Sequence, residues 1–339
     1  MTTISPYTPT PFSTPVANPA VGGSGTPYPY VSNSQFDFAP TGVDTSNLYP
    51  GGSAQQQAQV LADVLRRSSA WADRIAFGAD PAAKGASLCA TLSVEVAEVP
   101  ILNGEIRLVC DYKPIIQING VDTGPNMGAL SGIGDNVAGQ IRIGRRTIYV
   151  PMWAQGVRNN DVGNPNPYNT LSGKVVAVWS YVNGYPHTQL VSNITAATSI
   201  CTVQPTDGAS GLLGIIPNQS QFTIVDGANT ESFTVQAVGS TVVSGITYPT
   251  LTSVTPFKNS HIVPTAPDFL PVTSLPADVS QAVIFLTTAL IKTEGDNSLV
   301  LEELTEPKQV QKEYGDEFTD VTFAMKMLHS FGVRTKQKV

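Results

Sequence analysis

The sequence predicts an α+β protein in which a small helical bundle scaffold carries a β layer and an inserted all-β module, either a sandwich or a barrel. Apolar residues follow helical spacing near both ends of the chain, in residues 53–77, 276–293 and 316–331. Residues 87–271 between them alternate with a period of two and contain many turn signals. We therefore interpret the middle of the chain as material inserted into a helical scaffold.

The composition limits the class of protein. The chain has 339 residues, so we expect two or more units. Charged residues make up only 13%, about half of the usual globular share. This scarcity, together with 29 glycines and 26 prolines, is typical of all-β and virion-type proteins. The net charge of −7 argues against affinity for nucleic-acid phosphates.

We divide the chain into four parts. Residues 1–35 form a proline-rich N-terminal arm, and residues 36–185 form the first part of the body, a helix plus a β layer. Residues 186–270 are the inserted β module, and residues 271–339 are the C-terminal helical part and tail. The prolines of the arm disfavour a helix. The arm either lies along a neighbouring subunit, anchored by its aromatic residues, or is a loose tail, and both alternatives stay open.

The first helix has a clear beginning and end. Ser53 and Gln56 match a capping box, in which each side chain bonds the other residue's backbone N–H. Leu61 and Leu65 begin its apolar face, and Gly78 with Pro81 ends it.

The β layer follows at residue 88. Leu92, Val94 and Val96 alternate with polar residues and predict the apolar face of its first strand. The pair Asn103-Gly104 predicts a tight hairpin. Further strands are expected in residues 105–111, 114–118, 141–150 and 175–181.

The inserted module contains four predicted strands, in residues 198–203, 221–225, 232–238 and 248–254. Four strands within about 80 residues are typical of a small sandwich or barrel. Residues 226–231 invite a calcium interpretation, but they depart from the EF-hand pattern and lack flanking helices. We favour a hairpin turn at Asp226-Gly227.

The two C-terminal helices are marked by their ends. Pro276 suits the first turn of one helix, and Gly295 ends it. The last helix places Val321, Leu328 and Phe331 on one face and is followed by a short basic tail.

Groups with chemical potential are scattered. His187, His261 and His329 fall in three different segments and form no H-x-x-x-H or H-x-H pair. The chain has no nucleophile elbow or Walker phosphate loop. We therefore expect no enzyme, no catalytic residue, no cofactor and no metal site. The acidic residues between 296 and 306 are treated as solvated.

The environment of the protein can also be predicted. Cys89, Cys110 and Cys201 are odd in number and form no CxxC pair, which favours a reducing compartment without disulfides. The longest apolar run, residues 282–291, is too short to span a bilayer, so we expect no membrane contact. The N-terminus lacks a signal-peptide pattern.

Several short stretches carry a family resemblance. They are residues 38–44 (FAPTGVD) leading into 67–73 (RSSAWAD), 181–188 (YVNGYPHT), Asp226-Gly227, 275–279 (LPADV), and the closing helix 321–331 with its basic tail. Their order and spacing resemble those of the head–tail connector, or adaptor, proteins of long-tailed bacteriophages, particularly phages of actinobacteria. The resemblance covers most of residues 36–339.

The resemblance implies a structural virion protein at the neck, the head–tail interface, assembled in the host cytoplasm. Such adaptors form a ring, usually of twelve subunits, between the portal protein and the tail terminator or stopper protein, and DNA passes through the lumen without sequence-specific binding. A C-terminal segment docks on the portal. By analogy, the docking residues here are Phe331, Val333, Arg334, Lys336 and Lys338.

A second function stays open. The chain would be a tail or baseplate protein if its β module bound a cell-surface glycan. That function needs an exposed aromatic platform, for which Trp153, Trp179 and Tyr181 are the candidates. We expect the tryptophans, Trp71 included, to lie in cores instead.

Overall fold

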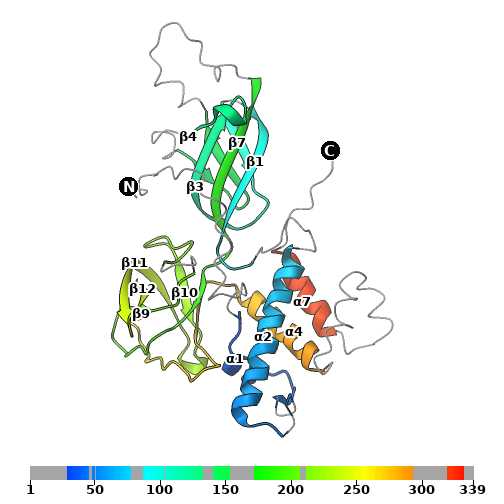
Figure 1. Cartoon of the computed structure of the whole chain (residues 1–339), viewed down its shortest axis with the longest axis vertical. Coiled ribbons are helices and arrows are strands. Elements are labelled where there is room, and N and C mark those ends of the chain that lie inside the picture. Colours follow the sequence, from blue (N-terminus) through cyan, green and yellow to red (C-terminus); the bar gives the residue numbers. More distant parts are fainter. Residues whose placement is uncertain are drawn as a thin grey trace. The chain divides into compact units, whose positions relative to one another are not determined.

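The computed structural model describes residues 29–45, 48–49, 51–77, 87–102, 104–132, 140–152, 172–206, 211–292 and 319–331 (Figure 1). Within these residues the chain forms two units. The sheet unit spans Thr91–Gly184, and the mixed unit contains the described residues up to Ala90 and from Tyr185 onward. The predictions for residues 1–28, 157–170, 293–318 and 332–339 lie outside the described residues.

The expected helical bundle scaffold is wrong, because the described structure is mostly β. It contains thirteen strands and four helices: α1 (Asn33–Asp37), α2 (Ala54–Phe77), α4 (Ala277–Lys292) and α7 (Thr319–His329). The strands lie in two antiparallel sheets of seven and six strands. Each sheet has its own buried apolar cluster. The strands therefore build cores of their own and are not decorations of a helical body.

The sheet unit contains seven strands in the order β4-β3-β7-β1-β2-β6-β5. Their bounds are β1 Thr91–Leu102, β2 Glu105–Val109, β3 Ile115–Gly124, β4 Ser131–Gly132, β5 Arg142–Ile143, β6 Thr147–Pro151 and β7 Ser172–Asn183. The longest ladder joins β1 to β7, from Thr91 opposite Asn183 to Leu102 opposite Ser172. Leu102 also pairs with Glu105, so the hairpin predicted at Asn103-Gly104 is present.

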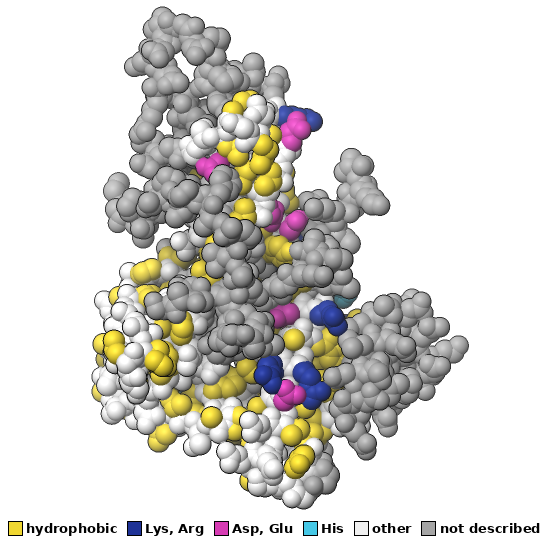
Figure 2. All heavy atoms as spheres, in the orientation of Figure 1, with side chains coloured by type: hydrophobic (Ala, Val, Ile, Leu, Met, Phe, Trp, Pro, Cys, Tyr) yellow, Lys and Arg dark blue, Asp and Glu magenta, His cyan; other side chains and the backbone are white. Residues whose placement is uncertain are grey.

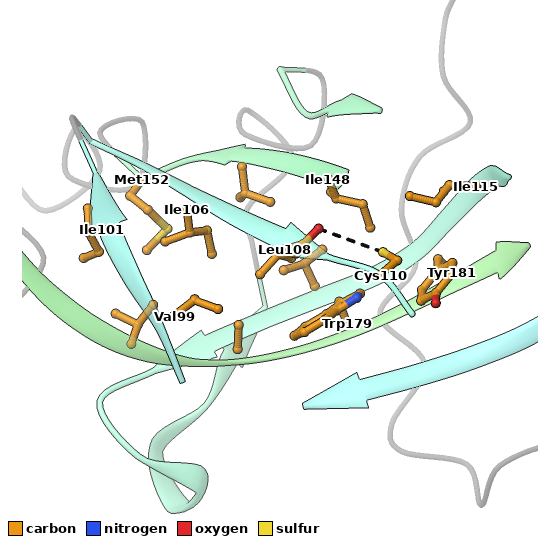
Figure 3. Close-up of a cluster of buried hydrophobic side chains, with 14 residues drawn as sticks. Val99, Ile101, Ile106, Leu108, Cys110, Ile115, Ile148, Met152, Trp179 and Tyr181 are labelled. Atoms are coloured by element: carbon orange, nitrogen blue, oxygen red, sulfur yellow. Dashed lines mark hydrogen bonds between the residues drawn. The ribbon is translucent and has the colours of Figure 1, made fainter. Parts of the chain in front are cut away.

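The core of the sheet unit lies on one face of this sheet (Figure 3). Ile106 and Leu108 of β2 and Ile148 and Val150 of β6 have no exposed surface. Figure 3 shows the ring of Trp179 from β7 among these aliphatic side chains. The burial of neighbouring strands against one apolar cluster stabilises the unit, because each buried methylene contributes about 0.8 kcal/mol.

The predicted apolar face of β1 is wrong. Val94 and Val96 are 48% and 54% exposed, whereas Val99 and Ile101 are buried on the opposite face. Apolar residues change from even to odd positions along this strand. The pairing of Ile101 with the buried Ile106 decides which set faces the core.

The mixed unit contains the second sheet, in the order β8-β13-β10-β11-β12-β9. Its strands are β8 His187–Gln189, β9 Ile200–Thr202, β10 Gln221–Ile224, β11 Glu231–Val243, β12 Ile246–Ser253 and β13 Pro271–Thr273. The two edges of this sheet meet. Leu190 bridges Val203, and the Val191 N–H donates to the Thr202 carbonyl at 2.9 Å. The sheet therefore curls into a small barrel around an apolar core.

Strands β11 and β12 are longer than the sequence predicted and form a hairpin that the pattern did not reveal. The turn residues Ser244 and Gly245 have φ values of 52° and 81°. Two consecutive positive φ angles are typical of a type I′ turn, which matches the twist of antiparallel strands. Val242 and Ile246 beside the turn are 66% and 57% exposed.

Helices α2, α4 and α7 pack together in the mixed unit, although they come from both ends of the chain (Figure 1). The predicted capping box at the start of α2 is present. The Ser53 N–H donates to Gln56 Oε1 at 2.9 Å, and the Gln56 N–H donates to Ser53 Oγ at 3.3 Å. Between α4 and α7, Lys292 pairs with Asp320 at 2.9 Å. Among the described helices, none is long and apolar enough to cross a membrane.

The two faces of β1 can be tested with one type of substitution. Val99→Ala should lower the free energy of unfolding by about 2 kcal/mol, because it removes two buried methyl groups and leaves a cavity. Val96→Ala, three residues away on the exposed face, should change it by less than about 0.5 kcal/mol. Urea denaturation of both variants measures the difference. Equal losses would contradict the assignment of the faces.

Candidate functional site

Tyr30 is the centre of a buried polar cluster in the mixed unit. Its side chain is 1% exposed, and its hydroxyl donates to Asp73 Oδ1 at 2.5 Å. The Ser87 hydroxyl lies 2.9 Å from the same Tyr30 oxygen. The Leu88 N–H also donates to Asp73 Oδ1, at 2.8 Å. The carboxyl of α2 therefore joins the segment before α1 to the segment that leads into β1.

The backbone around Tyr30 also forms hydrogen bonds with neighbouring elements. The Tyr30 N–H donates to Ser69 Oγ at 3.0 Å, and Ser69 lies one helical turn before Asp73 on the same face of α2. On the barrel side, His187 Nε2 lies 2.9 Å from the Pro29 carbonyl oxygen. The rings of Tyr30 and His187 meet edge to face at 5.5 Å. The segment at residues 29–30 is therefore bound to both α2 and β8.

Asn33 at the start of α1 continues this attachment. Its N–H donates to Asp268 Oδ1 at 3.0 Å, and its side-chain amide donates to the Ala58 carbonyl at 2.8 Å. We refer to residues 29–33 as the strap. The strap contacts both α2 and the end of the barrel. This short segment therefore connects parts of the chain that are distant in sequence.

Burial sets the protonation of the cluster. It raises the pKa of Asp73 to about 7, although hydrogen bonds from Tyr30, Leu88 and Ser87 act in the opposite direction. Burial and the nearby Asp73 raise the pKa of Tyr30 well above its usual value. Burial lowers the pKa of His187 to about 4, so its ring is neutral at pH 7. Since Pro29 offers only a carbonyl oxygen, Nε2 must carry the proton.

The groups of this cluster are buried and already take part in hydrogen bonds. A carboxyl with a pKa near 7 can exchange a proton, but Asp73 is only 7% exposed and its Oδ1 accepts two hydrogen bonds. Burial raises the pKa of the neighbouring Cys89 to about 12, so this thiol stays protonated and is a weak nucleophile. The arrangement holds the strap against α2.

A second polar cluster lies at one end of the barrel. The imidazole of His261 has no exposed surface, and its two nitrogens face two carboxylates. Nδ1 lies 2.9 Å from Asp226 Oδ2, and Nε2 lies 2.8 Å from Glu231 Oε1. Each ring nitrogen therefore lies within hydrogen-bonding distance of one carboxylate. The backbone N–H groups of Lys258 and Asn259 also donate to Glu231.

The contacts of Glu231 lower its pKa. Burial opposes the charged form, but the donors from Lys258, His261 and Asn259 together outweigh it and hold the pKa of this carboxyl below its usual value. Asp226 and Glu231 flank the connection between β10 and β11, where the sequence indicated a hairpin turn. They bind His261, and the described residues contain no cluster suited to a metal ion.

The predicted docking residues are only partly described. Phe331 is 7% exposed and packs edge to face on Tyr185 with 6.0 Å between ring centres. Val333, Arg334, Lys336 and Lys338 lie outside the described residues.

The candidate aromatic platform is not assembled among the described residues. Trp179 and Tyr181 are 2% and 0% exposed and belong to the core of the sheet unit (Figure 3). Trp71 is also buried, and Trp153 lies outside the described residues. The three cysteines are free thiols.

A group of cations in the sheet unit was missed at the level of sequence. Arg107 lies on β2, and Lys113 lies in the loop after this strand. Arg142 lies on β5, and Arg145 and Arg146 lie in the turn into β6. We call these five residues the basic strip. The signal in the sequence was three arginines within residues 142–146, which the negative net charge of the whole chain concealed.

No family model matches this chain, and neither the curated proteins nor the solved structures contain a significant match to it.

The raised pKa of Asp73 predicts a pH-dependent effect of Asp73→Asn. The protonated carboxyl is favoured in the folded state, so its stabilising contribution is full below pH 3.8 and is lost as pH rises towards 7. The variant escapes this loss. Its free energy of unfolding relative to the natural protein should therefore rise between pH 4 and pH 8, by at most roughly 4 kcal/mol. Chemical denaturation across this range measures the difference, and a constant difference would argue against a buried neutral carboxyl.

The lowered pKa of Glu231 predicts the opposite trend for Glu231→Gln. The charged carboxyl is favoured in the folded state, so its contribution is present above pH 4.5 and is lost as pH falls through the lower folded value. The variant should be destabilised at pH 7, by about 1–3 kcal/mol, and less so near pH 3. Thermal denaturation at both values tests this, with Glu98→Gln on the exposed face of β1 as the control.

Proposed function

We propose that this chain is a structural virion protein, a head–tail adaptor that forms a ring between the portal and the tail terminator or stopper. The observation that carries the proposal is the packing of α2, α4 and α7. Helices from both ends of the chain meet in one cluster. The resemblance in sequence also falls on these helices, at residues 67–73, 275–279 and 321–331. The two sheets arise from the chain between them.

The hairpin of β11 and β12 supports a role in assembly. Residues 232–257 contain no Asp, Glu, Lys, Arg or His. Val238, Val242 and Ile246 on this hairpin are each more than 40% exposed. On the face of the barrel that Figure 2 shows, at the lower left, the coloured side chains are hydrophobic and the others are white. Exposed aliphatic residues without neighbouring charge are typical of surfaces that another protein covers, and in a ring the partner is the adjacent subunit.

The buried clusters fit a protein whose task is mechanical. Asp73 and Asp268, which accept from the strap, and the carboxylates around His261 join distant segments of the mixed unit. A subunit that transmits load between a capsid and a tail needs such connections within each copy. Because these groups are buried, they give less support to an enzymatic function, which requires reactive groups that a substrate can reach.

Docking on the portal is assigned to the C-terminal tail. The ring of Phe331 against Tyr185 fixes the point at which the chain leaves the helical cluster. Val333, Arg334, Lys336 and Lys338 follow it in the sequence. Three cations in a short tail suit an acidic surface on the portal.

The glycan-binding alternative has less support. Two of its three candidate aromatic residues, Trp179 and Tyr181, lie in the core of the sheet unit. A sugar needs an exposed ring face, and these two rings are covered by aliphatic side chains.

Negative-stain electron microscopy of the protein mixed with its portal protein tests the proposal. We expect rings with the symmetry of the portal, twelvefold in the expected case, when both proteins are present. A chain that stays monomeric at every concentration and never associates with the portal would refute the adaptor function. Binding to a glycan array by the same preparation would instead favour a tail or baseplate protein.

The contribution of the tail can be isolated with matched variants. Replacement of Arg334, Lys336 and Lys338 by alanine should weaken association with the portal at least tenfold, because it removes three charges from the docking segment. The control replaces Arg74, Lys174 and Lys258, three exposed cations of the two units, by alanine. Pull-down on immobilised portal compares the variants, and equal losses would argue against docking through the tail.

A further inference from the structure

The basic strip concentrates positive charge on one edge of an acidic protein. The chain carries a net charge of −7, yet Arg107, Lys113, Arg142, Arg145 and Arg146 lie on β2, β5 and the segments that follow them. Strand β6 pairs with both β2 and β5, so these three strands are neighbours at the end of the sheet. The strip is therefore a feature of the fold and not only of the sequence.

At one end of the strip, two arginines share an aromatic ring. The guanidinium groups of Arg107 and Arg142 lie 5.8 Å and 5.2 Å from the centre of the Tyr149 ring. Both arginines also contact Glu105, but their side chains remain 59% and 70% exposed. One carboxylate therefore compensates two cations, and the ring orients both guanidinium groups on the surface.

At the other end, three cations gather around the turn between β5 and β6. The Gly144 N–H donates to the Thr147 carbonyl at 2.8 Å and closes this turn, on which Arg145 is exposed. Arg146 Nη2 donates to the Asp111 carbonyl at 3.3 Å and so stays beside the loop that holds Lys113. Partial burial lowers the pKa of Lys113, and the nearby positive charges of Arg146 and Arg145 lower it further.

Among the residues that the structure describes, few carboxylates lie near the strip. Glu105 binds Arg107 and Arg142, and Asp111 lies in the loop next to Lys113. Glu95 points to the inner face, where the Tyr181 hydroxyl donates to it. Among the described residues no carboxylate forms an ion pair with Arg145. The strip keeps a positive balance that a ligand with several negative charges would neutralise.

We propose that the basic strip binds the phosphate backbone of double-stranded DNA without reading its sequence. From Arg107 to Cys110, whose N–H donates to the Arg146 carbonyl, the extended chain covers about 10 Å. Duplex DNA carries one negative charge per roughly 1.7 Å of its axis, so a strip of this length faces several phosphates. Four of the five cations are arginines, whose planar guanidinium group bonds phosphate oxygens in pairs. The described strip presents a strand edge and a tight turn, with no helix to enter a groove.

The biological setting of this inference rests on the proposed function, in which DNA passes through the ring. A few backbone contacts give weak binding that salt suppresses, which allows DNA to move past the protein. The strip thus refines the expectation from net charge: the chain as a whole repels DNA, and one edge of the sheet unit contacts it locally.

Fluorescence anisotropy of a labelled 30-base-pair duplex, titrated with the full chain, tests the proposal. We expect binding at about 50 mM salt that weakens steeply towards 200 mM and does not depend on sequence. The double variant Arg142→Gln/Arg145→Gln should bind roughly tenfold more weakly and reduce the slope of log affinity against log salt by about 2, for two lost phosphate contacts. The control Arg66→Gln/Arg74→Gln removes the same charge from exposed positions of α2 and should bind like the natural protein.

The outcomes separate this inference from the adaptor function. Rings on the portal without any DNA binding at low salt would overturn the basic strip and leave the adaptor intact. Salt-dependent DNA binding that the double variant loses, in a protein that never meets the portal, would support the strip and refute the adaptor. Unchanged DNA binding by the double variant together with lost portal association would overturn the proposal, because the strip would then be a protein contact.

Discussion

The mixed unit depends on the buried contact between the hydroxyl of Tyr30 and the carboxyl of Asp73. Asp73 also accepts the Leu88 N–H, and the strap around Tyr30 reaches Ser69 and His187. Removal of one partner would leave a buried polar group unsatisfied, at a cost of about 1–3 kcal/mol for each group. Helix α2, the barrel and the segment before β1 meet at this contact, so its loss would affect all three.

Local features were predictable from the sequence, and long-range ones were not. The capping box of Ser53 and Gln56 and the turn at Asn103-Gly104 involve neighbouring residues, and both are present. The face of β1 was misread because its apolar residues change parity, and only pairing with β2 decides the inner face. The prediction of a helical scaffold was wrong because pairing between strands, which local patterns do not show, decides how long the strands are and how much of the chain is β. Strand β11, for example, extends five residues beyond its predicted end at residue 238. The Tyr30 cluster joins residues far apart in sequence, and no local pattern indicates it.

Charge is scarce in this chain, and the structure separates it by use. Asp73 and His187 are buried, and Glu231 is mostly buried. Each of the three has hydrogen-bonding partners and joins segments of the mixed unit. The exposed cations of the basic strip lie together on one edge of the sheet unit. A net charge averages these groups, which explains why it excluded a nucleic-acid partner although the fold gathers five cations.

The same separation leaves the hairpin of β11 and β12 without a charged side chain after Glu231 at its start. Residues 232–257 form most of β11 and β12, and their exposed valines and isoleucine lie on a long, regular hairpin. Exposed strands of soluble proteins usually carry charges that prevent association with other chains. The lack of such protection makes sense if another protein covers the hairpin in its working state. An uncharged surface for subunits and a basic edge for DNA are two different requirements, and the ring around a DNA channel that we propose would have both.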